Sequence, residues 1–184
     1  MDPFWRELPD ALRRAAWDRF DARYDFRPGM DPASWPAIRE PADSMTFDLS
    51  PIFSGDALGA AGWEAVEAEA RRALLAVFAD EEVTVLDWQH AAYAVPPGQL
   101  AMAPGSRWPE ENEAWPVTVV PNGDYYAFLS ADLAVGTFGH PWERTLCVIG
   151  EPMVVTLGRT LETWLPVLRR GGQPPTGAFR TPVL

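Results

Sequence analysis

The side chains of this sequence best suited to chemistry are two histidines and a few carboxylates in its second half. The candidates are His90, Asp124, His140 and Glu143. Two imidazoles and two carboxylates can exchange protons as general acids and bases, or bind a small molecule in a shared pocket. If the chain is an enzyme or a small-molecule-binding protein, we therefore expect these four side chains to converge on one cavity.

The spacing of these residues does not follow a metal-binding or cofactor-binding motif. The chain has no His-Glu-x-x-His and no Cys-x-x-Cys, and no phosphate-binding pattern follows Gly136 and Gly139. Cys147, the only cysteine, lies in an apolar run, which predicts a buried and unreactive thiol. The sequence therefore predicts no metal site and no cofactor.

A second set of candidates consists of exposed aromatic and acidic side chains. Residues 96–114 contain four prolines and an acidic cluster, and a loop of this length inside a compact domain is often functional. Tryptophans in loops can anchor a partner protein. The predicted binding residues are Trp108, Glu110, Glu111, Glu113 and Trp142.

The charge balance narrows the class of partner. The chain contains fifteen arginines, no lysine and twenty-six acidic residues, so its net charge is −11. Such a surface repels nucleic-acid phosphates and anionic membranes, and it favours a basic protein as partner. The single cysteine, the absence of a long apolar run and an N-terminus unlike a signal peptide predict a cytoplasmic protein. The oligomeric state stays open.

Hydrophobic periodicity indicates the elements that would position these residues. Apolar stripes predict helices over 8–24, from Asp56 or Gly62 to about Ala79, and from Pro152 to near Gly171, with Pro166 kinking or ending the last one. Alternation predicts strands, and Asn122-Gly123 predicts a hairpin between the third and fourth of them. The predicted strands cover 45–49, 83–95, 115–120, 124–130, 135–140 and 143–149.

Short links between these strands predict an α+β fold, with a mainly antiparallel sheet of about five to six strands flanked by three helices. We expect one domain over residues 1–184. It would carry an N-terminal helical extension over about 1–44 and a loosely held tail over about 173–184. In the last helix, Leu157, Leu161 and Trp164 are expected to be buried.

Four short runs carry a resemblance to a known family. They are Trp17–Asp21, Val85–His90, Pro121–Tyr126 and Gly139–Glu143. With these runs the chain resembles an uncharacterised bacterial family of unknown function that is common in GC-rich actinobacteria, from about Trp17 to Arg170. This resemblance implies no activity and no catalytic residue.

The last third is also similar, in the order of its elements, to the SUKH superfamily. The similar segments are Asp124–Leu129, Thr137–His140, Thr145–Ile149 and Leu157–Leu165. This similarity implies a compact α+β fold, and many members of that superfamily act as immunity proteins against secreted toxins. The helices before Val83 and the loop after Val95 are not covered by it.

Three hypotheses of function follow. The favoured one is a protein-binding module, an immunity-type inhibitor of a basic toxin or nuclease, whose acidic surface imitates phosphates. The second is an enzyme or small-molecule-binding protein that uses His90, Asp124, His140 and Glu143. The third is a structural or self-associating domain without a separate activity.

Overall fold

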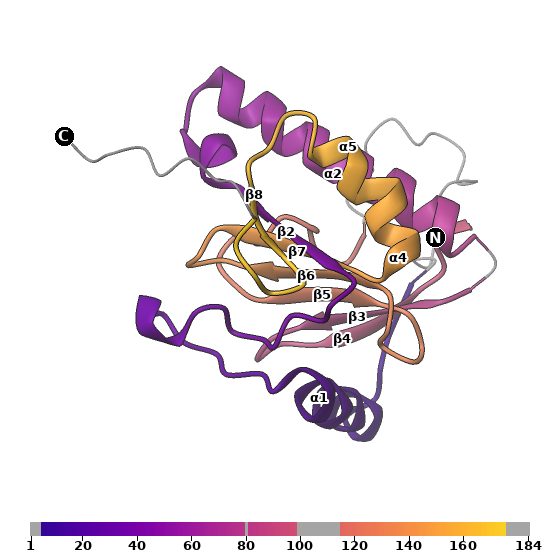
Figure 1. Ribbon diagram of the computed structural model, residues 1–184. Coiled ribbons are helices and arrows are strands. Elements are labelled where there is room, and N and C mark those ends of the chain that lie inside the picture. The colour runs from indigo at the N-terminus through magenta and orange to yellow at the C-terminus, as the bar shows by residue number, and fades with distance from the viewer. Residues whose placement is uncertain (1–4, 80, 99–114, 176–184) are drawn as a thin grey trace.

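An eight-stranded antiparallel sheet forms the centre of the protein (Figure 1). The computed structural model describes residues 5–79, 81–98 and 115–175. The strand order is β1-β4-β3-β5-β6-β7-β2-β8. The strands are β1 (Arg6–Glu7), β2 (Ser44–Asp48), β3 (Val83–Asp87), β4 (Ala92–Val95), β5 (Tyr126–Leu129), β6 (Gly136–His140), β7 (Thr145–Ile149) and β8 (Val167–Arg170). The predicted α+β class is confirmed, but five to six strands was too few.

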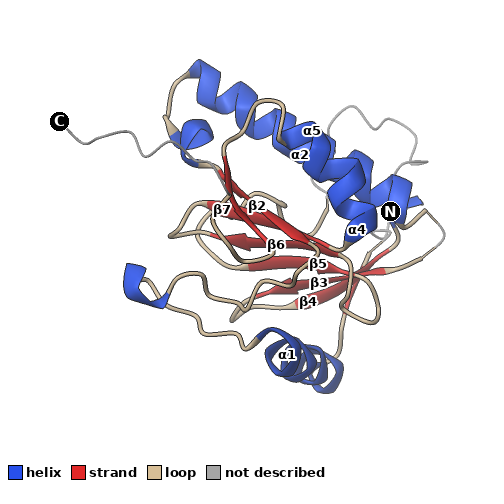
Figure 2. Cartoon of the chain, in the orientation of Figure 1, coloured by secondary structure: helices blue, strands red, loops and turns tan. Residues whose placement is uncertain are grey.

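Helices cover both faces of this sheet (Figure 2). α1 (Asp10–Tyr24) lies on one face. On the other lie α2 (Ala57–Val77) and a helical stretch made of α4 (Glu151–Met153), a π-helical turn (Val154–Gly158) and α5 (Arg159–Leu161). Two short 3₁₀ turns cover Pro32–Ser34 and Ser50–Phe53. None of the helices in the described part of the chain is long and apolar enough to cross a membrane.

Each face of the sheet has its own hydrophobic core. Met45, Phe47 and Leu146 pack toward α2, whereas Phe138 and Ile149 pack toward α1 with Phe20 and Tyr24 of that helix. The central strands therefore read as nearly continuous apolar runs, because both of their faces are buried. Because the strands are held from both sides, the polar candidate residues at or near the strand ends also have defined positions.

Two predicted strands differ in the structure. Residues 83–95 form a hairpin of β3 and β4 rather than one bent strand, because the chain turns at Gln89, whose φ is +66°. Residues 115–120 form no strand, and the backbone N–H of Val120 donates to Glu67 of α2 at 2.7 Å. Prolines at 116 and 121 remove backbone donors at both ends of that segment. The predicted Asn122-Gly123 hairpin was therefore wrong, and β5 pairs with β3 and β6 instead.

The last predicted helix is shorter than expected. It ends at Leu161, and after Pro166 the chain extends into β8, which pairs with β2 at an edge of the sheet. Leu157 and Leu161 are buried as predicted, but Trp164 lies beyond the helix and is 42% exposed. Proline ends a helix because it lacks the N–H donor and clashes with the preceding turn.

The two long helices, α1 and α2, begin in different ways. Of the two predicted starts of the second helix, Asp56 and Gly62, the structure uses Asp56, whose Oδ1 caps α2 by accepting from the Gly59 N–H at 2.8 Å. No side chain caps α1: Pro9 occupies the cap position, and Asp10 lies in the first turn, paired with Arg13 at 3.1 Å. The Pro9 carbonyl accepts from the backbone N–H groups of Leu12 and Arg13, each at 2.9 Å, and so closes the first turn.

Candidate functional site

The four runs that carry the family resemblance meet around one buried ring, that of Tyr125. Its centroid lies 5.4 Å from Trp88, 4.8 Å from His140 and 5.0 Å from Trp142. The remaining run, on α1, joins through Trp17, which stacks on Phe26, and Phe26 contacts Tyr125 edge-on at 5.2 Å. Segments far apart in the sequence therefore build one aromatic centre on the α1 side of the sheet.

A polar cluster lies at the edge of this centre, where β3 ends and β5 begins. The turn after β3 is closed by bonds from the Asp87 N–H to the Ala91 carbonyl and from the His90 N–H to the Asp87 carbonyl. It folds the imidazole of His90 back over Asp87. The Trp88 N–H donates to the Tyr125 carbonyl, which places Asp124 beside the same turn.

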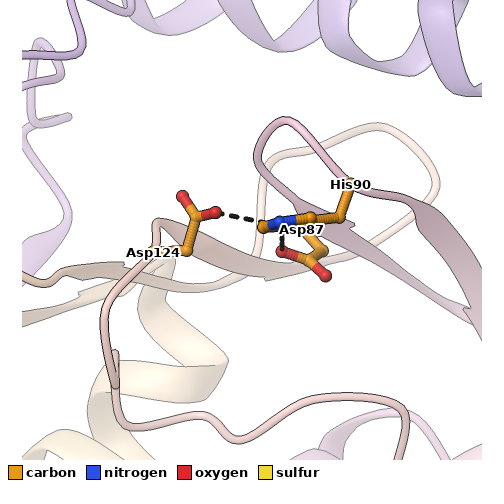
Figure 3. Close-up of side chains that lie close together, drawn as sticks. All are labelled: Asp87, His90 and Asp124. Atoms are coloured by element: carbon orange, nitrogen blue, oxygen red, sulfur yellow. Dashed lines mark hydrogen bonds and ion pairs between the residues drawn. The ribbon is translucent and has the colours of Figure 1, made fainter.

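In this cluster one imidazole nitrogen faces two carboxylates (Figure 3). His90 Nδ1 lies 3.1 Å from Asp87 Oδ1 and 3.1 Å from Asp124 Oδ2. The side chain of His90 is 65% exposed, whereas those of Asp87 and Asp124 are 10% and 13% exposed. The site is therefore open on the histidine side and closed on the carboxylate side.

Burial and pairing set the protonation of this cluster. Burial raises the pKa of Asp87 and of Asp124, and contact with His90 opposes that shift in both. The hydrogen bond to Asp87, followed by its charge, raises the pKa of His90. The arrangement can hold a proton between an imidazole and a carboxylate, or replace that proton by a cation.

The other two predicted catalytic residues lie in a different environment. His140 is buried among aromatic rings, and its Nδ1 accepts from the Glu143 backbone N–H at 3.1 Å. Glu143 pairs with Arg169 through contacts of 2.6 and 2.9 Å, and Arg169 also pairs with Glu40 at 2.9 Å. The structure thus brings His90 and Asp124 together in one cluster, and it places His140 and Glu143 in a separate buried network.

A surface depression lies between α1 and the turn after β3. Its volume is about 340 Å³, and it is lined by Arg13, Trp17, Asp18, Asp21, Phe26, Pro28, Trp88 and Gln89. Three of these residues are aromatic and two are carboxylates one helical turn apart. Arg13 is engaged by Asp10, whereas neither Asp18 nor Asp21 has an arginine partner among the described residues.

Of the predicted binding residues, one can be placed. Trp142 is half-buried and packs edge-on against Tyr125 and His140. Trp108, Glu110, Glu111 and Glu113 lie outside the described residues.

Sequence reasoning missed Asp87 and the residues of the depression. The Asp87-x-x-His90 spacing would have been the signal for Asp87, had a turn been expected there. Asp18 and Asp21 lie on the polar face of the predicted helix over 8–24, where exposed charges are usual and indicate no site.

Comparison with known proteins places the chain in a family. A model described as a protein of unknown function, DUF2716, matches residues 7–154, a span that contains all four runs. An uncharacterised protein of Bacillus subtilis (strain 168), YxiI, is 30% identical over 155 residues, which cover 82% of this chain and 90% of that protein. No solved structure matches. The chain therefore belongs to the DUF2716 family of proteins of unknown function.

Proposed function

We propose that the protein is a binding module for a basic partner protein, specifically an immunity-type inhibitor of a basic toxin or nuclease in the cytoplasm. The observation that carries this proposal is the aromatic depression with Asp18 and Asp21 at its rim. The net charge of −11 adds a long-range attraction for such a partner. The immunity role is proposed from the resemblance in element order that the sequence of the last third bears to the SUKH superfamily.

The depression has the chemistry that a cationic side chain requires. Trp17 and Phe26 stack with their centroids 5.5 Å apart, and Trp88 meets Phe26 edge-on at 6.3 Å. A guanidinium group is attracted to aromatic faces, most strongly to Trp. The carboxylates of Asp18 and Asp21 can then accept its hydrogen bonds, which are strong when both partners are charged. An arginine or lysine of the partner is the expected occupant.

The position of Asp21 also favours a binding role. It lies in the last turn of α1, where the helix dipole disfavours a negative charge. Replacing it by asparagine is therefore expected to leave the free energy of unfolding unchanged or slightly higher. A residue that weakens binding when replaced but does not weaken the fold acts in recognition.

The experiment is a co-expression and binding assay with any basic toxin domain that a neighbouring gene encodes. We expect the chain to protect cells from that domain and to bind it with an association rate that falls as salt rises. Asp18→Asn, Asp21→Asn and Trp88→Ala should each weaken binding. Glu151→Gln, an exposed charge on the α4 side, is the matched control and should bind like the unaltered chain.

Two outcomes would contradict the proposal. One is the absence of protection together with no binding to any basic domain from that neighbourhood. The other is binding that all three depression variants retain in full while their circular dichroism spectra match the unaltered protein, because the partner would then contact another surface.

A second candidate function is favoured by the meeting of His90 with Asp87 and Asp124. A paired imidazole and carboxylate can act as a general base on a small substrate. A hydrolase substrate screen of the unaltered chain and of His90→Ala tests this alternative. Turnover that the variant lacks would support an enzyme, and equal or absent turnover in both would exclude one using His90 on those substrates.

A further inference from the structure

We infer that Asp87, His90 and Asp124 form a binding site for one divalent transition-metal ion, such as Zn²⁺ or Mn²⁺. This inference does not depend on the proposed protein-binding role. The ligand atoms are a carboxylate oxygen of Asp87, Nδ1 of His90 and a carboxylate oxygen of Asp124, which all lie within 4.8 Å of one another. The three residues come from the end of β3, the turn after it and the segment before β5 (Figure 3).

The distances fit shared coordination. Bonds of about 2.1 Å place neighbouring ligand atoms about 3.0–3.4 Å apart around an octahedral or tetrahedral ion. The two contacts of His90 Nδ1, at 3.1 Å each, lie in that interval. The carboxylate oxygens of Asp87 and Asp124, which lie within 4.8 Å of each other, would move together to share an ion with His90.

The charges of the cluster are not balanced by the groups that form it. The two carboxylates are largely buried and face a single imidazole nitrogen, which carries at most one proton. One N–H can donate well to only one of two acceptors. A divalent cation would take the place of that proton and neutralise both carboxylates, which removes their mutual repulsion.

The surroundings orient the ligands and leave an entry path. Asp124 Oδ1 accepts from the Tyr125 backbone N–H at 2.8 Å, which directs Oδ2 toward His90. Such supporting hydrogen bonds fix the orientation of ligands in metal sites. The imidazole side is exposed, so an ion can enter there and complete its coordination with water. One imidazole with two carboxylates suits Zn²⁺ or Mn²⁺, because Mg²⁺ and Ca²⁺ prefer oxygen ligands only.

The test is calorimetric titration of the untagged, EDTA-treated chain with ZnCl₂ and with MnCl₂. We expect one saturable site for at least one of these ions. His90→Ala, Asp87→Asn and Asp124→Asn should each weaken that site at least about tenfold. Glu151→Gln, which removes an exposed carboxylate on the α4 side, should bind the ion like the unaltered chain.

A spectroscopic readout separates a specific site from loss of folding. Added Zn²⁺ should shift the NMR signals of the His90 ring and leave those of the buried His140 ring in place. Circular dichroism of each variant checks that the fold is retained. The inference is overturned if neither ion binds at one saturable site, or if folded His90→Ala and Asp124→Asn variants bind the ion as tightly as the unaltered chain.

Discussion

The two histidines show how strongly local surroundings decide what one residue type can do. His90 is exposed between two carboxylates, and the hydrogen bond to Asp87 raises its pKa. His140 is enclosed by aromatic rings, and burial lowers its pKa to about 4. The first side chain is available to a proton, a metal ion or a ligand, whereas the second is a neutral part of the core.

The buried His140 predicts a loss of stability in acid. Because its pKa is about 4 when folded and 6.5 in the unfolded chain, the unfolded state binds more protons between these values. The stabilising difference is present above pH 6.5 and is lost as pH falls toward 4, by up to about 3 kcal/mol. Urea unfolding at pH 7.5, 5.5 and 4.5 measures it.

The matched variant for this prediction is His140→Asn, which retains an acceptor for the Glu143 N–H but does not titrate. The carboxylates of Glu40 and Glu67, whose pKa values burial raises, titrate in both proteins and cancel in the comparison. The same pH dependence in both proteins would show that His140 is not the group responsible.

Glu67 carries a second prediction at the residue scale. It is buried on α2, accepts from the Val120 backbone N–H at 2.7 Å and pairs with Arg71 at 3.2 Å. Glu67→Ala should lower the free energy of unfolding by about 2–3 kcal/mol, because a buried N–H loses its acceptor. Glu67→Gln should cost less, since the amide oxygen can still accept that hydrogen bond.

The exposed neighbour Glu64 is the control for Glu67, and Glu64→Ala should change stability by less than about 0.5 kcal/mol. Equal costs for Glu67→Ala and Glu64→Ala in urea unfolding would contradict the structural role of Glu67.

Among the elements, regular segments with a strong pattern could be predicted from sequence, and turns could not. Phe20, Val66 and Leu74 repeat at helical spacing and are buried in α1 and α2 as the pattern indicates. Gln89 occupies a left-handed turn position that usually attracts Gly or Asn, so the β3–β4 turn left no signal. A single strand over 83–95 places Asp87 and His90 on opposite faces, so the sequence prediction separates two residues that the turn brings together.

The prediction for the last helix was wrong for a related reason. Leu165 and Leu168 continue the helical stripe of Leu157 and Leu161, so periodicity alone favours a longer helix. The structure instead ends the helix and uses Val167–Arg170 as a strand beside β2. Pairing with an unfilled sheet edge is a long-range effect, and local spacing does not contain it.

Pairing of β5 with β6 requires a glycine at position 136. Its φ is +149°, and a Cβ there would lie 1.8 Å from the Phe128 carbonyl oxygen. Gly136→Ala should therefore destabilise the protein by more than about 1 kcal/mol, or prevent folding. Gly123 is the control, because its φ is +138° but no atom lies near its Cβ position. Gly123→Ala therefore has only the backbone strain and should lower the midpoint of thermal unfolding clearly less than Gly136→Ala.

For the whole molecule, the surplus of negative charge predicts that added salt raises the stability of the fold and weakens binding to a basic partner. At a net charge of −11, self-repulsion opposes the compact state, and salt screens it. Raising NaCl from about 20 mM to about 300 mM should increase the midpoint of thermal unfolding while it weakens binding to the basic partner. A parallel rise in both quantities would argue against electrostatic recognition.

The span of the family match ends at residue 154, but the folded unit continues past it. Arg169 of β8 is the cation that pairs with both buried carboxylates, those of Glu40 and Glu143. A protein shortened at residue 154 would keep both carboxylates without their counter-ion and would present β2 as a bare sheet edge. Such a fragment should aggregate on expression, because the twenty-one described residues after 154 close the domain.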